Sequence, residues 1–495
     1  MSVLRIHELD NVAVAIDAVT AGESVTAGGI VITSRSAVEK GHKLALRDIA
    51  PGEPVVKYGF PIGRATMPIQ AGDWVHVHNL KTGLGDILEY QFQPFQLPEV
   101  CGETVAEFQG YRRADGRVGV RNEIWIIPTV SCVNRAAQLI ARAAAVRWDS
   151  RKNIDGIFEL THPYGCSQLG EDHCNTQQIL ANFVAHPNAG GVLVLGLGCE
   201  NNHIAEFKKV LGNYDERRVK FLVAQEVEDE VASGLELVEE LIEHAEGFSR
   251  SLWPVSELVV GLKCGGSDGF SGITANPLVG ALSDRLICQG GSSVLTEVPE
   301  MFGAETLLMN RAVNSEVFTK TVKLINDFKT YFSAYNQPIY ENPSPGNKKG
   351  GISTLEEKSL GCTQKGGSRA VVDVLPYGGT VSEKGLNLLS APGNDMVAAT
   401  ALAAAGCQII LFTTGRGTPL GTVIPTVKIA TNSDVFRRKA NWMDFDAGPL
   451  LAGKTLDEVT DEFFAYLLSV ASGKMVKAES MGFREITIFK NGVTL

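Results

Sequence analysis

Two histidines stand two residues apart in the stretch AGDWVHVHNL, in a chain of 495 residues that has nine histidines in all. On a β-strand, residues i and i+2 point to the same face about 7 Å apart, so His76 and His78 could bind one metal ion together. Trp74 would share that face, while Val75 and Val77 would point into the core. The alternative is a polar pair on a solvent-exposed hairpin. The pattern makes His76 and His78 candidate metal ligands.

Four cysteines each follow an apolar run that is typical of a buried strand. Ligands of open parallel sheets bind beyond the carboxyl ends of the strands, so we expect these cysteines at one level of a sheet, where they could bind a metal ion. The alternative is that each is a small residue that fills space near the sheet edge. The four are Cys132, Cys166, Cys199 and Cys264.

Side chains that could transfer protons stand near these cysteines. THPYGCSQLGEDHC carries two histidines, and GLGCEN carries a glutamate directly after its cysteine. GHKLAL adds a lysine after a glycine, for which a solvent-exposed position is the alternative. General acid–base catalysis uses these residue types. The candidate catalytic residues are His162, His173, Lys43 and Glu200.

Polar loops rich in glycine suit a small anionic ligand with many hydroxyl groups. APGNDM and TTGRGTP expose backbone N–H groups and add one guanidinium group. A serine beside the cysteine of YGCSQ and the histidine of GHKLAL could hold the same ligand. The candidate substrate-binding residues are His42, Ser167, Asn394, Arg416 and Thr418.

The composition disfavours several classes of protein. Hydrophobic residues make up 44% of the chain and charged residues 20%, a mixture typical of globular proteins, and no apolar run approaches the ~20 residues of a membrane span. The net charge is −11 and no Lys/Arg cluster occurs, so neither a membrane nor a nucleic acid is an expected partner. The start of the chain lacks a signal-peptide pattern, which predicts a cytoplasmic protein. No GxxxxGK[ST] loop or complete dinucleotide fingerprint is present, which argues against a nucleotide-dependent reaction.

The pattern of apolar runs predicts an α/β protein with three domains. Residues 1–95 contain short strand patterns separated by AG, GG and PG turns, which predicts a small all-β domain, and residues 96–110 are the predicted linker. From residue 111, apolar strand patterns alternate with amphipathic helix patterns, as in largely parallel sheets covered by helices on both faces. We predict one α/β domain over 111–255 and a C-terminal α/β domain over 256–495.

Longer motifs occur along the whole chain. They are VKYGFPIGRAT with DWVHVHN, GRVGVRNEIWIIPTVSCVN, THPYGCSQLGEDH, GLGCENN, CGGSDGFSGITANP, TEVPEMFGAE, YENPSPGNKKGGISTLEEKSLGCTQK, and LLSAPGNDM with FTTGRGTP. Together they resemble the altronate/galactarate dehydratase family of sugar-acid dehydratases, and the similarity is greatest to its altronate branch. The resemblance extends from end to end and is far more specific than any single motif.

The resemblance implies an N-terminal SAF-type β-clip domain, α/β domains after it, an iron(II) requirement and the removal of water from a hexonate. For the altronate branch, the reaction converts D-altronate to 2-dehydro-3-deoxy-D-gluconate in hexuronate catabolism. Galactarate dehydratase and sulfolactate sulfo-lyase share the architecture, so another sugar acid such as galactarate is the alternative. The family and the size of the chain also predict a homodimer.

Dehydration of an aldonate takes a proton from C2, beside the carboxylate, and expels the C3 hydroxyl group. A divalent metal ion chelated by that carboxylate would absorb the developing charge as a Lewis acid. Imidazole and thiolate suit iron(II) better than magnesium, so His76 and His78 are the first ligands expected, with the four cysteines as ligands or neighbours and manganese(II) as an alternative ion. An iron–sulfur cluster held by three of the four cysteines is a second hypothesis.

Two functions from other classes remain as alternatives. A protein that binds sugar acids without catalysis would use the β domain for recognition and return its ligand unchanged. An NAD-dependent oxidoreductase is disfavoured because the dinucleotide fingerprint is incomplete.

Overall fold

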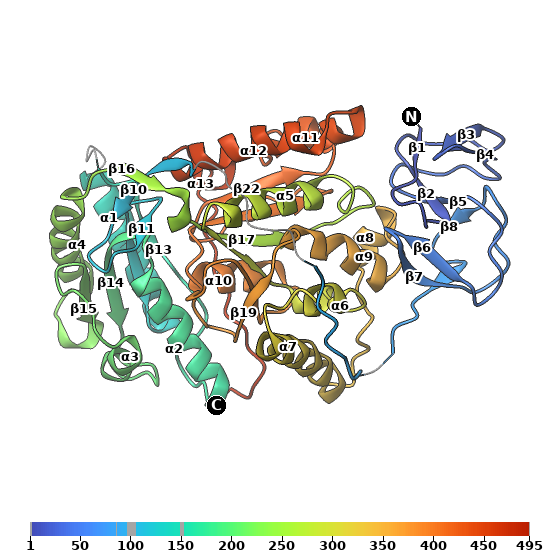
Figure 1. Cartoon of the computed structure of the whole chain (residues 1–495). Helices are drawn as coiled ribbons and strands as arrows, with labels where there is room; N and C mark the ends of the chain where they lie inside the picture. The colour runs from blue at the N-terminus through green and yellow to red at the C-terminus, as the bar shows by residue number, and fades with distance from the viewer. Residues whose placement is uncertain (1, 86, 97–104, 149–152, 495) are drawn as a thin grey trace.

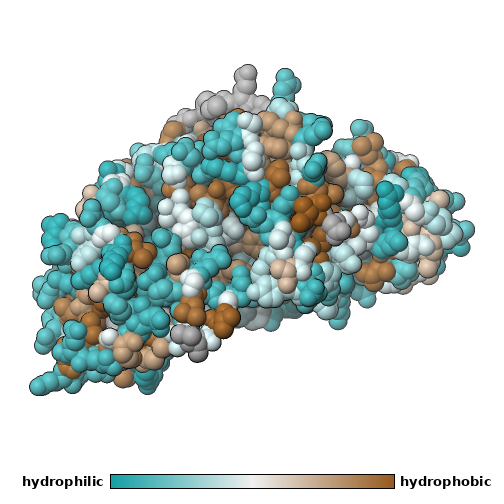
Figure 2. Space-filling view, turned by 90° about the horizontal axis from the view of Figure 1, so that it is seen from below, coloured by the Kyte–Doolittle hydropathy of each residue, from teal (hydrophilic) through white to brown (hydrophobic). Residues whose placement is uncertain are grey.

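The computed structural model describes residues 2–85, 87–96, 105–148 and 153–494, which form three domains (Figure 1). The N-terminal domain lies at one end of the molecule, the C-terminal domain in the middle and the second domain at the other end. The face drawn in Figure 2 is mainly hydrophilic, with hydrophobic residues in small separate patches. Among the described residues, no helix has the length and apolar character needed to cross a bilayer.

The N-terminal domain consists of short antiparallel strands, which confirms the all-β domain predicted from the turn signals. Its sheets have the orders β1-β2-β5-β8, β3-β4 and β6-β7-β9. Gly72 shows why the turns need glycine, because its φ is +85° and a Cβ there would lie 2.0 Å from the Thr33 carbonyl oxygen. The strands are β1 (Val3–Leu4), β2 (Val12–Ala15), β3 (Ser24–Ala27), β4 (Ile30–Thr33), β5 (Lys43–Ala45), β6 (Pro54–Lys57), β7 (Phe60–Ala65), β8 (Trp74–Val75) and β9 (Leu80–Lys81).

The predicted linker over 96–110 lies largely outside the part of the chain that the structure describes. Its residues 97–104 lie outside the described residues. The chain then forms β10 (Glu107–Arg112), which pairs antiparallel with β11 (Val118–Gly119) and β16 (Ser251–Pro254). This three-stranded sheet joins the beginning and the end of the second domain.

The second domain has a parallel sheet with the order β13-β12-β14-β15. Helices α1 and α4 cover one face, and α2 and α3 cover the other. Strands β12 and β14 are buried along their whole length, which explains their continuous apolar sequence. The elements are β12 (Glu123–Pro128), η1 (Ser131–Val133), α1 (Asn134–Trp148), β13 (Gly156–Glu159), α2 (Gly170–Ala185), β14 (Ala189–Gly196), α3 (Ile204–Leu211), β15 (Val219–Val223), η2 (Ala224–Glu226) and α4 (Glu230–Glu246).

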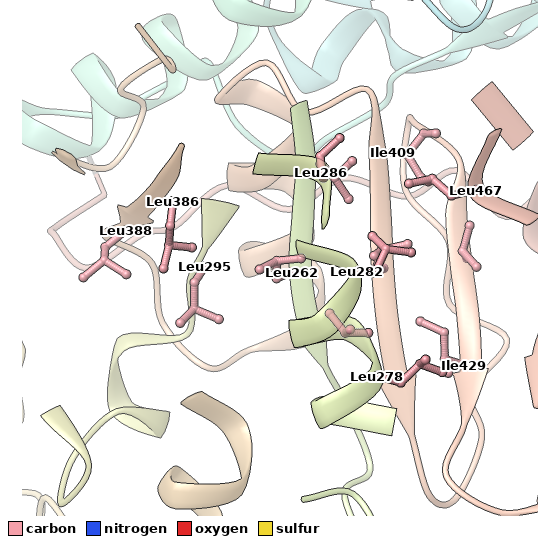
Figure 3. Close-up of a cluster of buried hydrophobic side chains, with 14 of the residues drawn as sticks. Leu262, Leu278, Leu282, Leu286, Leu295, Leu386, Leu388, Ile409, Ile429 and Leu467 are labelled. Atoms are coloured by element: carbon pink, nitrogen blue, oxygen red, sulfur yellow. The ribbon is translucent and has the colours of Figure 1, made fainter. Parts of the chain in front are cut away.

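The C-terminal domain contains a seven-stranded parallel sheet with the order β19-β20-β18-β17-β21-β22-β23, so both predicted α/β units are confirmed. Leucines of α5 pack against aliphatic residues of the central strands (Figure 3). The elements are η3 (Val255–Glu257), β17 (Val259–Cys264), α5 (Ala275–Cys288), β18 (Ser292–Leu295), η4 (Val298–Glu300), α6 (Glu305–Met309), α7 (Ser315–Ala334), α8 (Pro345–Lys349), α9 (Leu355–Cys362), η5 (Thr363–Gly366), β19 (Val371–Leu375), β20 (Leu386–Leu389), α10 (Asp395–Ala404), β21 (Ile409–Thr414), β22 (Thr426–Ala430), α11 (Ser433–Arg438), β23 (Phe445–Asp446), η6 (Gly448–Ala452), α12 (Leu456–Ala471) and α13 (Lys477–Ser480).

Helix α9 is buried over its whole length where the N-terminal and C-terminal domains meet, although it carries several charged residues. Burial of a charge is unfavourable unless the charge is paired. Glu357 on this helix lies 2.8 Å from the Nζ atoms of both Lys43 and Lys57, which come from the N-terminal domain. Burial alone would raise the pKa of Glu357, but the charges of Lys43 and Lys57 outweigh it and hold the pKa at about 2. This buried triad joins the two domains.

We expect Glu357→Gln to lower the free energy of unfolding by about 3 kcal/mol at neutral pH. We also expect the stability of this variant to change less with pH in the acid range. The unfolded carboxylate takes up a proton first because its pKa is higher than the folded value, so the stabilisation is complete above about pH 4.5 and is lost as the pH falls toward 2. Denaturant unfolding between about pH 3 and 7 measures the effect, with Glu236→Gln at an exposed position of α4 as the control. Parallel pH profiles for the wild type and Glu357→Gln would contradict the assignment.

Candidate active site

The two histidines of VHVHN do not share a strand face. Strand β8 ends at Val75 and the residues after it form a turn, so the strand predicted through both histidines is wrong. Val77, expected in the core, is 49% exposed. His76 is buried, with its Nδ1 2.9 Å from Ser353 Oγ, whereas His78 is exposed. The common face that the metal-pair hypothesis required is therefore absent.

Trp74 contacts both histidine rings, with centroid distances of 5.4 Å to His76 and 4.9 Å to His78. The ring of His42 lies 4.9 Å from that of His76. His42 Nδ1 accepts a hydrogen bond from Trp74 Nε1 at 3.1 Å, and its Nε2 lies 3.3 Å from the Lys349 carbonyl oxygen. Burial lowers the pKa of His42, and it lowers the pKa of His76 to about 4. Both rings are neutral at pH 7, and they hold the N-terminal domain against the end of α8 and the loop before α9.

The four strand-end cysteines lie on two different sheets, which corrects the prediction of a single level. Cys132, Cys166 and Cys199 follow β12, β13 and β14 of the second domain, and all three are exposed. Cys264 is the last residue of β17 in the C-terminal sheet and is 1% exposed. The two groups need separate explanations.

Cys264 contacts two residues that the strand pattern did not single out. Its Sγ lies 2.9 Å from Glu300 Oε2 and 3.4 Å from Cys362 Sγ, and Cys362 Sγ lies 3.1 Å from the same carboxylate oxygen. Within the part of the chain that the structure describes, no other trio of His, Cys, Asp or Glu side chains brings its ligand atoms within 4.8 Å of one another. We refer to Cys264, Glu300 and Cys362 as the thiol–carboxylate cluster.

Lysines surround the thiol–carboxylate cluster. Lys358 Nζ lies 2.7 Å from Glu300 Oε1, and Lys365 Nζ lies 3.3 Å from Glu297 Oε2. Glu297 also accepts a hydrogen bond from the Cys264 backbone N–H at 2.9 Å. Burial alone would raise the pKa of Glu300, but Lys358 and Lys365 outweigh it and hold the pKa far below its ordinary value. Glu300 is therefore an ionised carboxylate in positively charged surroundings.

A cavity of about 550 Å³ lies beside the cluster. Glu300 and Lys358 line it, together with Asn394 and Asp395 at the start of α10. Lys263 Nζ donates a hydrogen bond to Asp395 Oδ1 at 2.9 Å. Aromatic residues of α7 complete the wall. The cavity lies beyond the carboxyl ends of β17, β18 and β20, the edge at which parallel sheets bind ligands.

Three family models match successive parts of the chain. They describe the altronate/galactarate dehydratase SAF domain over residues 1–83, the second domain of D-galactarate dehydratase/altronate hydrolase over 110–246, and the C-terminal part of D-galactarate/altronate dehydratase over 255–494. The chain belongs to the altronate/galactarate dehydratase family. This membership confirms the family resemblance and the N-terminal SAF domain.

The chain has full-length relatives in two bacteria. It is 55% identical to altronate dehydratase of Bacillus subtilis (strain 168) and 54% identical to altronate dehydratase of Escherichia coli (strain K12), with 100% of each chain covered in both comparisons. It is 35% identical to galactarate dehydratase (L-threo-forming) of E. coli (strain K12), over 95% of this chain and 93% of that protein.

Three of the four predicted catalytic residues, Glu200, His162 and His173, lie in the second domain. The hydrogen bonds of Glu200 and His162 are to backbone groups and to groups of the surrounding loops. The Glu200 carboxylate accepts a hydrogen bond from Thr129 Oγ1 at 2.7 Å and from backbone N–H groups of its own loop. His162 Nε2 lies 2.7 Å from the Pro128 carbonyl oxygen, and burial lowers the pKa of His162 to about 4. His173 lies on α2. None of these residues lines the cavity beside the cluster.

The fourth predicted catalytic residue, Lys43, lies between the N-terminal and C-terminal domains. Its Nζ contacts Glu357 and donates a hydrogen bond to the Gly351 carbonyl oxygen at 2.7 Å. Burial lowers the pKa of Lys43 to about 8. Its contacts with Glu357 and the loop before α9 give it a role in joining the domains.

The predicted substrate-binding residues are divided among several places. Asn394 lines the cavity beside the cluster and caps the N-terminus of α10. Arg416 lines a separate cavity of about 690 Å³ between the SAF domain and the C-terminal sheet. Thr418 accepts a hydrogen bond within its own loop. Ser167 belongs to the second domain, and His42 holds the SAF domain in place.

Sequence reasoning missed Glu300, Lys358 and Cys362. Glu300 follows β18. The expectation that ligands bind beyond the carboxyl ends of parallel strands would have indicated it if the short strand SSVL had been recognised. Lys358 and Cys362 lie on α9, where no local spacing distinguishes them from residues of a solvated helix. The available signal was the motif that contains them, STLEEKSLGCTQK.

Proposed function

We propose that the protein is a metal-dependent hydro-lyase that converts D-altronate to 2-dehydro-3-deoxy-D-gluconate and water. The observation that carries the proposal is the cavity beside the thiol–carboxylate cluster, where an ionised carboxylate and a lysine face the same space at the ligand-binding edge of a parallel sheet. The full-length identity to two altronate dehydratases supports the choice of substrate. The lower identity to galactarate dehydratase makes galactarate the second candidate.

The cavity suits a sugar acid in size and in the chemistry of its lining. Its volume of about 550 Å³ is within the usual range for small-molecule sites. Lys358 supplies a positive charge for the substrate carboxylate. Polar side chains of Asn342, Ser344 and Asn347 line the same cavity and can form hydrogen bonds with sugar hydroxyl groups.

The thiol–carboxylate cluster fits a divalent cation such as iron(II). Two sulfurs and one carboxylate oxygen, all from buried residues, lie within 4.8 Å of one another. Thiolate ligands favour iron over magnesium, and this set suits iron(II) better than manganese(II). Cys264, Glu300 and Cys362 would hold the ion, whereas His76 and His78 are outside this set. Such an ion, when bound, supplies a Lewis acid for the reaction.

The residues that line the cavity can perform the remaining chemistry. Removal of the C2 proton builds negative charge on the substrate carboxylate, and the ammonium group of Lys358 stabilises that charge. Dehydration also needs a base at C2, for which we propose the Asp395 carboxylate, and an acid that protonates the departing C3 hydroxyl group. Lys263 holds the Asp395 carboxylate in position through their hydrogen bond.

Conversion of D-altronate by the purified protein tests this function. After treatment with a chelator and reloading with iron(II) without oxygen, we expect formation of a 2-oxo acid from D-altronate faster than from galactarate or other sugar acids. The chelated protein should be at least about 100-fold slower, and iron(II) should restore its rate more fully than manganese(II). Full activity in excess chelator would contradict the metal requirement. D-Altronate recovered unchanged would instead indicate a binding protein.

The proposal includes a cytoplasmic location, because the substrate belongs to hexuronate catabolism. It also includes a homodimeric assembly, and a small-molecule sugar acid in place of a nucleic acid or a membrane as the partner. These points were predicted from the composition of the chain and from the family resemblance.

A further inference from the structure

Three cysteines of the second domain have no role in the proposed reaction, yet they are arranged around one sheet edge. Cys132, Cys166 and Cys199 follow β12, β13 and β14, which are neighbours in the order β13-β12-β14. All three are exposed free thiols. Cysteine is among the residue types most often buried, so three exposed cysteines at the ends of adjacent strands need a specific explanation.

Hydrogen bonds tie the three cysteine-bearing loops to one another. Ser131, before Cys132, donates its backbone N–H to the Tyr164 carbonyl oxygen at 2.9 Å. The backbone N–H of Asn202 reaches the Gly165 carbonyl oxygen, directly before Cys166, at 3.2 Å. Gly165 packs so closely on the first loop that a Cβ there would lie 2.0 Å from the carbonyl oxygen of Thr129. The loops therefore form one rigid surface that carries three thiols.

Each of these loops also carries a side-chain amide that forms a hydrogen bond through one of its two polar atoms and leaves the other without a partner. Asn134 Oδ1, Gln168 Nε2 and Asn202 Oδ1 are buried and have no hydrogen-bond partner among the described residues. They follow the three cysteines by two or three residues along the chain. Gln168 is 4% exposed and Asn202 is 0% exposed. Buried polar groups are nearly always satisfied. Gln168 Nε2 is a donor, so it is the one of the three that could donate a hydrogen bond to a sulfur ligand bound at this edge.

The spacing of the thiols argues against a single metal ion. A tetrahedral ion holds its thiolates about 4 Å apart, but among the described residues the sulfurs of Cys132, Cys166 and Cys199 do not all lie within 4.8 Å of one another. A four-iron cluster places its thiolate ligands at different corners and so fits a wider triangle. Gln225 Nε2 already lies 3.5 Å from Cys199 Sγ, and N–H groups near sulfur are typical of cluster sites.

We propose that Cys132, Cys166 and Cys199 bind a [4Fe–4S] cluster whose fourth iron has no protein thiolate and is open to an oxygen ligand. The site is separate from the thiol–carboxylate cluster of the C-terminal domain, because its cysteines lie on a different sheet. An experiment can therefore find metal at one of the two sites and none at the other, so each proposal is tested independently.

Reconstitution of the full-length protein tests the proposal. The reduced, metal-free protein is incubated with iron(II) and sulfide without oxygen and desalted, and its iron, acid-labile sulfide and visible absorption are measured. We expect about four sulfides per chain in the wild type and a loss of at least about tenfold in Cys132→Ser, Cys166→Ser and Cys199→Ser. Sulfide is the decisive quantity, because an ion at the thiol–carboxylate cluster brings iron without sulfide.

The chain offers a matched control for these variants. Cys174 is also an exposed free thiol, on α2 of the same domain, and Cys174→Ser should keep the full sulfide content. Exposed substitutions change stability by roughly 0.5 kcal/mol or less, so thermal unfolding of all four variants should match the wild type. Equal sulfide loss in Cys174→Ser, unchanged sulfide in the three cysteine variants, or a wild type that takes up iron without sulfide would each overturn the proposal.

The open iron has its own signature. Ferricyanide should take one electron from the [4Fe–4S]²⁺ cluster, which then releases one Fe²⁺ and leaves a [3Fe–4S]⁺ cluster with its own electron paramagnetic resonance signal. A cluster that keeps all of its iron after this treatment would contradict ligation by only three cysteines.

Discussion

Replacement of Lys358 by methionine is expected to lower kcat for D-altronate by about 100- to 1,000-fold, the usual loss when one group that stabilises developing charge is removed. Lys358 lines the cavity, and its Nζ lies 2.7 Å from Glu300 Oε1. Methionine keeps much of the side-chain volume but removes the positive charge. Steady-state kinetics with iron(II) at saturation measures the effect, and kcat should fall more than KM rises because the charge develops only as the C2 proton leaves.

Lys329 provides the control for this variant. It is another buried lysine of the C-terminal domain, paired with Glu305 at 3.3 Å, and it does not line the cavity. Lys329→Met should lose stability in the same way as Lys358→Met but keep a kcat close to that of the wild type. A folded Lys358→Met protein with kcat within about tenfold of the wild type would exclude Lys358 from the reaction.

Glu300→Gln is expected to abolish tight metal binding at the thiol–carboxylate cluster, with a loss of affinity greater than about 100-fold, since loss of a supporting residue near a metal already costs 10- to 100-fold. Glu300 Oε2 lies 2.9 Å from Cys264 Sγ and 3.1 Å from Cys362 Sγ. Cobalt(II) can be titrated in place of iron(II), because its bonds to thiolate give a charge-transfer absorption. The band should be weak in Glu300→Gln and absent when both cysteines are replaced by serine.

The titration is carried out in a background in which the exposed cysteines of the second domain are replaced by serine, so that the band reports only one site. Glu305→Gln is the matched control, because it removes a buried, lysine-paired carboxylate away from the cluster. A full cobalt–thiolate band in Glu300→Gln would show that the carboxylate is not a ligand. Loss of the band in Glu305→Gln would show that the effect is structural.

The sequence predicted the two parallel sheets because strands buried on both faces are apolar throughout, as in β12 and β14. The same rule located Cys264 at the end of a strand. It could not place Cys362, because Cys362 lies on α9, 98 residues after Cys264, and the two side chains meet only in the folded chain. Contacts of this kind depend on the tertiary path of the chain and leave no periodic signal.

The predicted histidine pair failed for a local reason. The alternation in WVHVHN is typical of a strand, but the side chain of Asn79 turns the chain after Val75. Asn79 Oδ1 accepts a hydrogen bond from the His76 backbone N–H at 3.0 Å, and its Nδ2 donates to the Trp74 carbonyl oxygen at 2.9 Å. An asparagine that closes such a turn competes with strand pairing, and the alternation alone does not reveal it.

The location of the substrate is the central claim, and a crystal structure of the Lys358→Met variant soaked with D-altronate without oxygen tests it most directly. Slow turnover in this variant should leave the sugar acid intact. We predict its density in the cavity that Glu300, Asn394 and Asp395 line, beyond the carboxyl ends of β17, β18 and β20. Density for D-altronate beside Arg416, or at the cysteine-bearing loops of the second domain, with this cavity empty, would contradict the account.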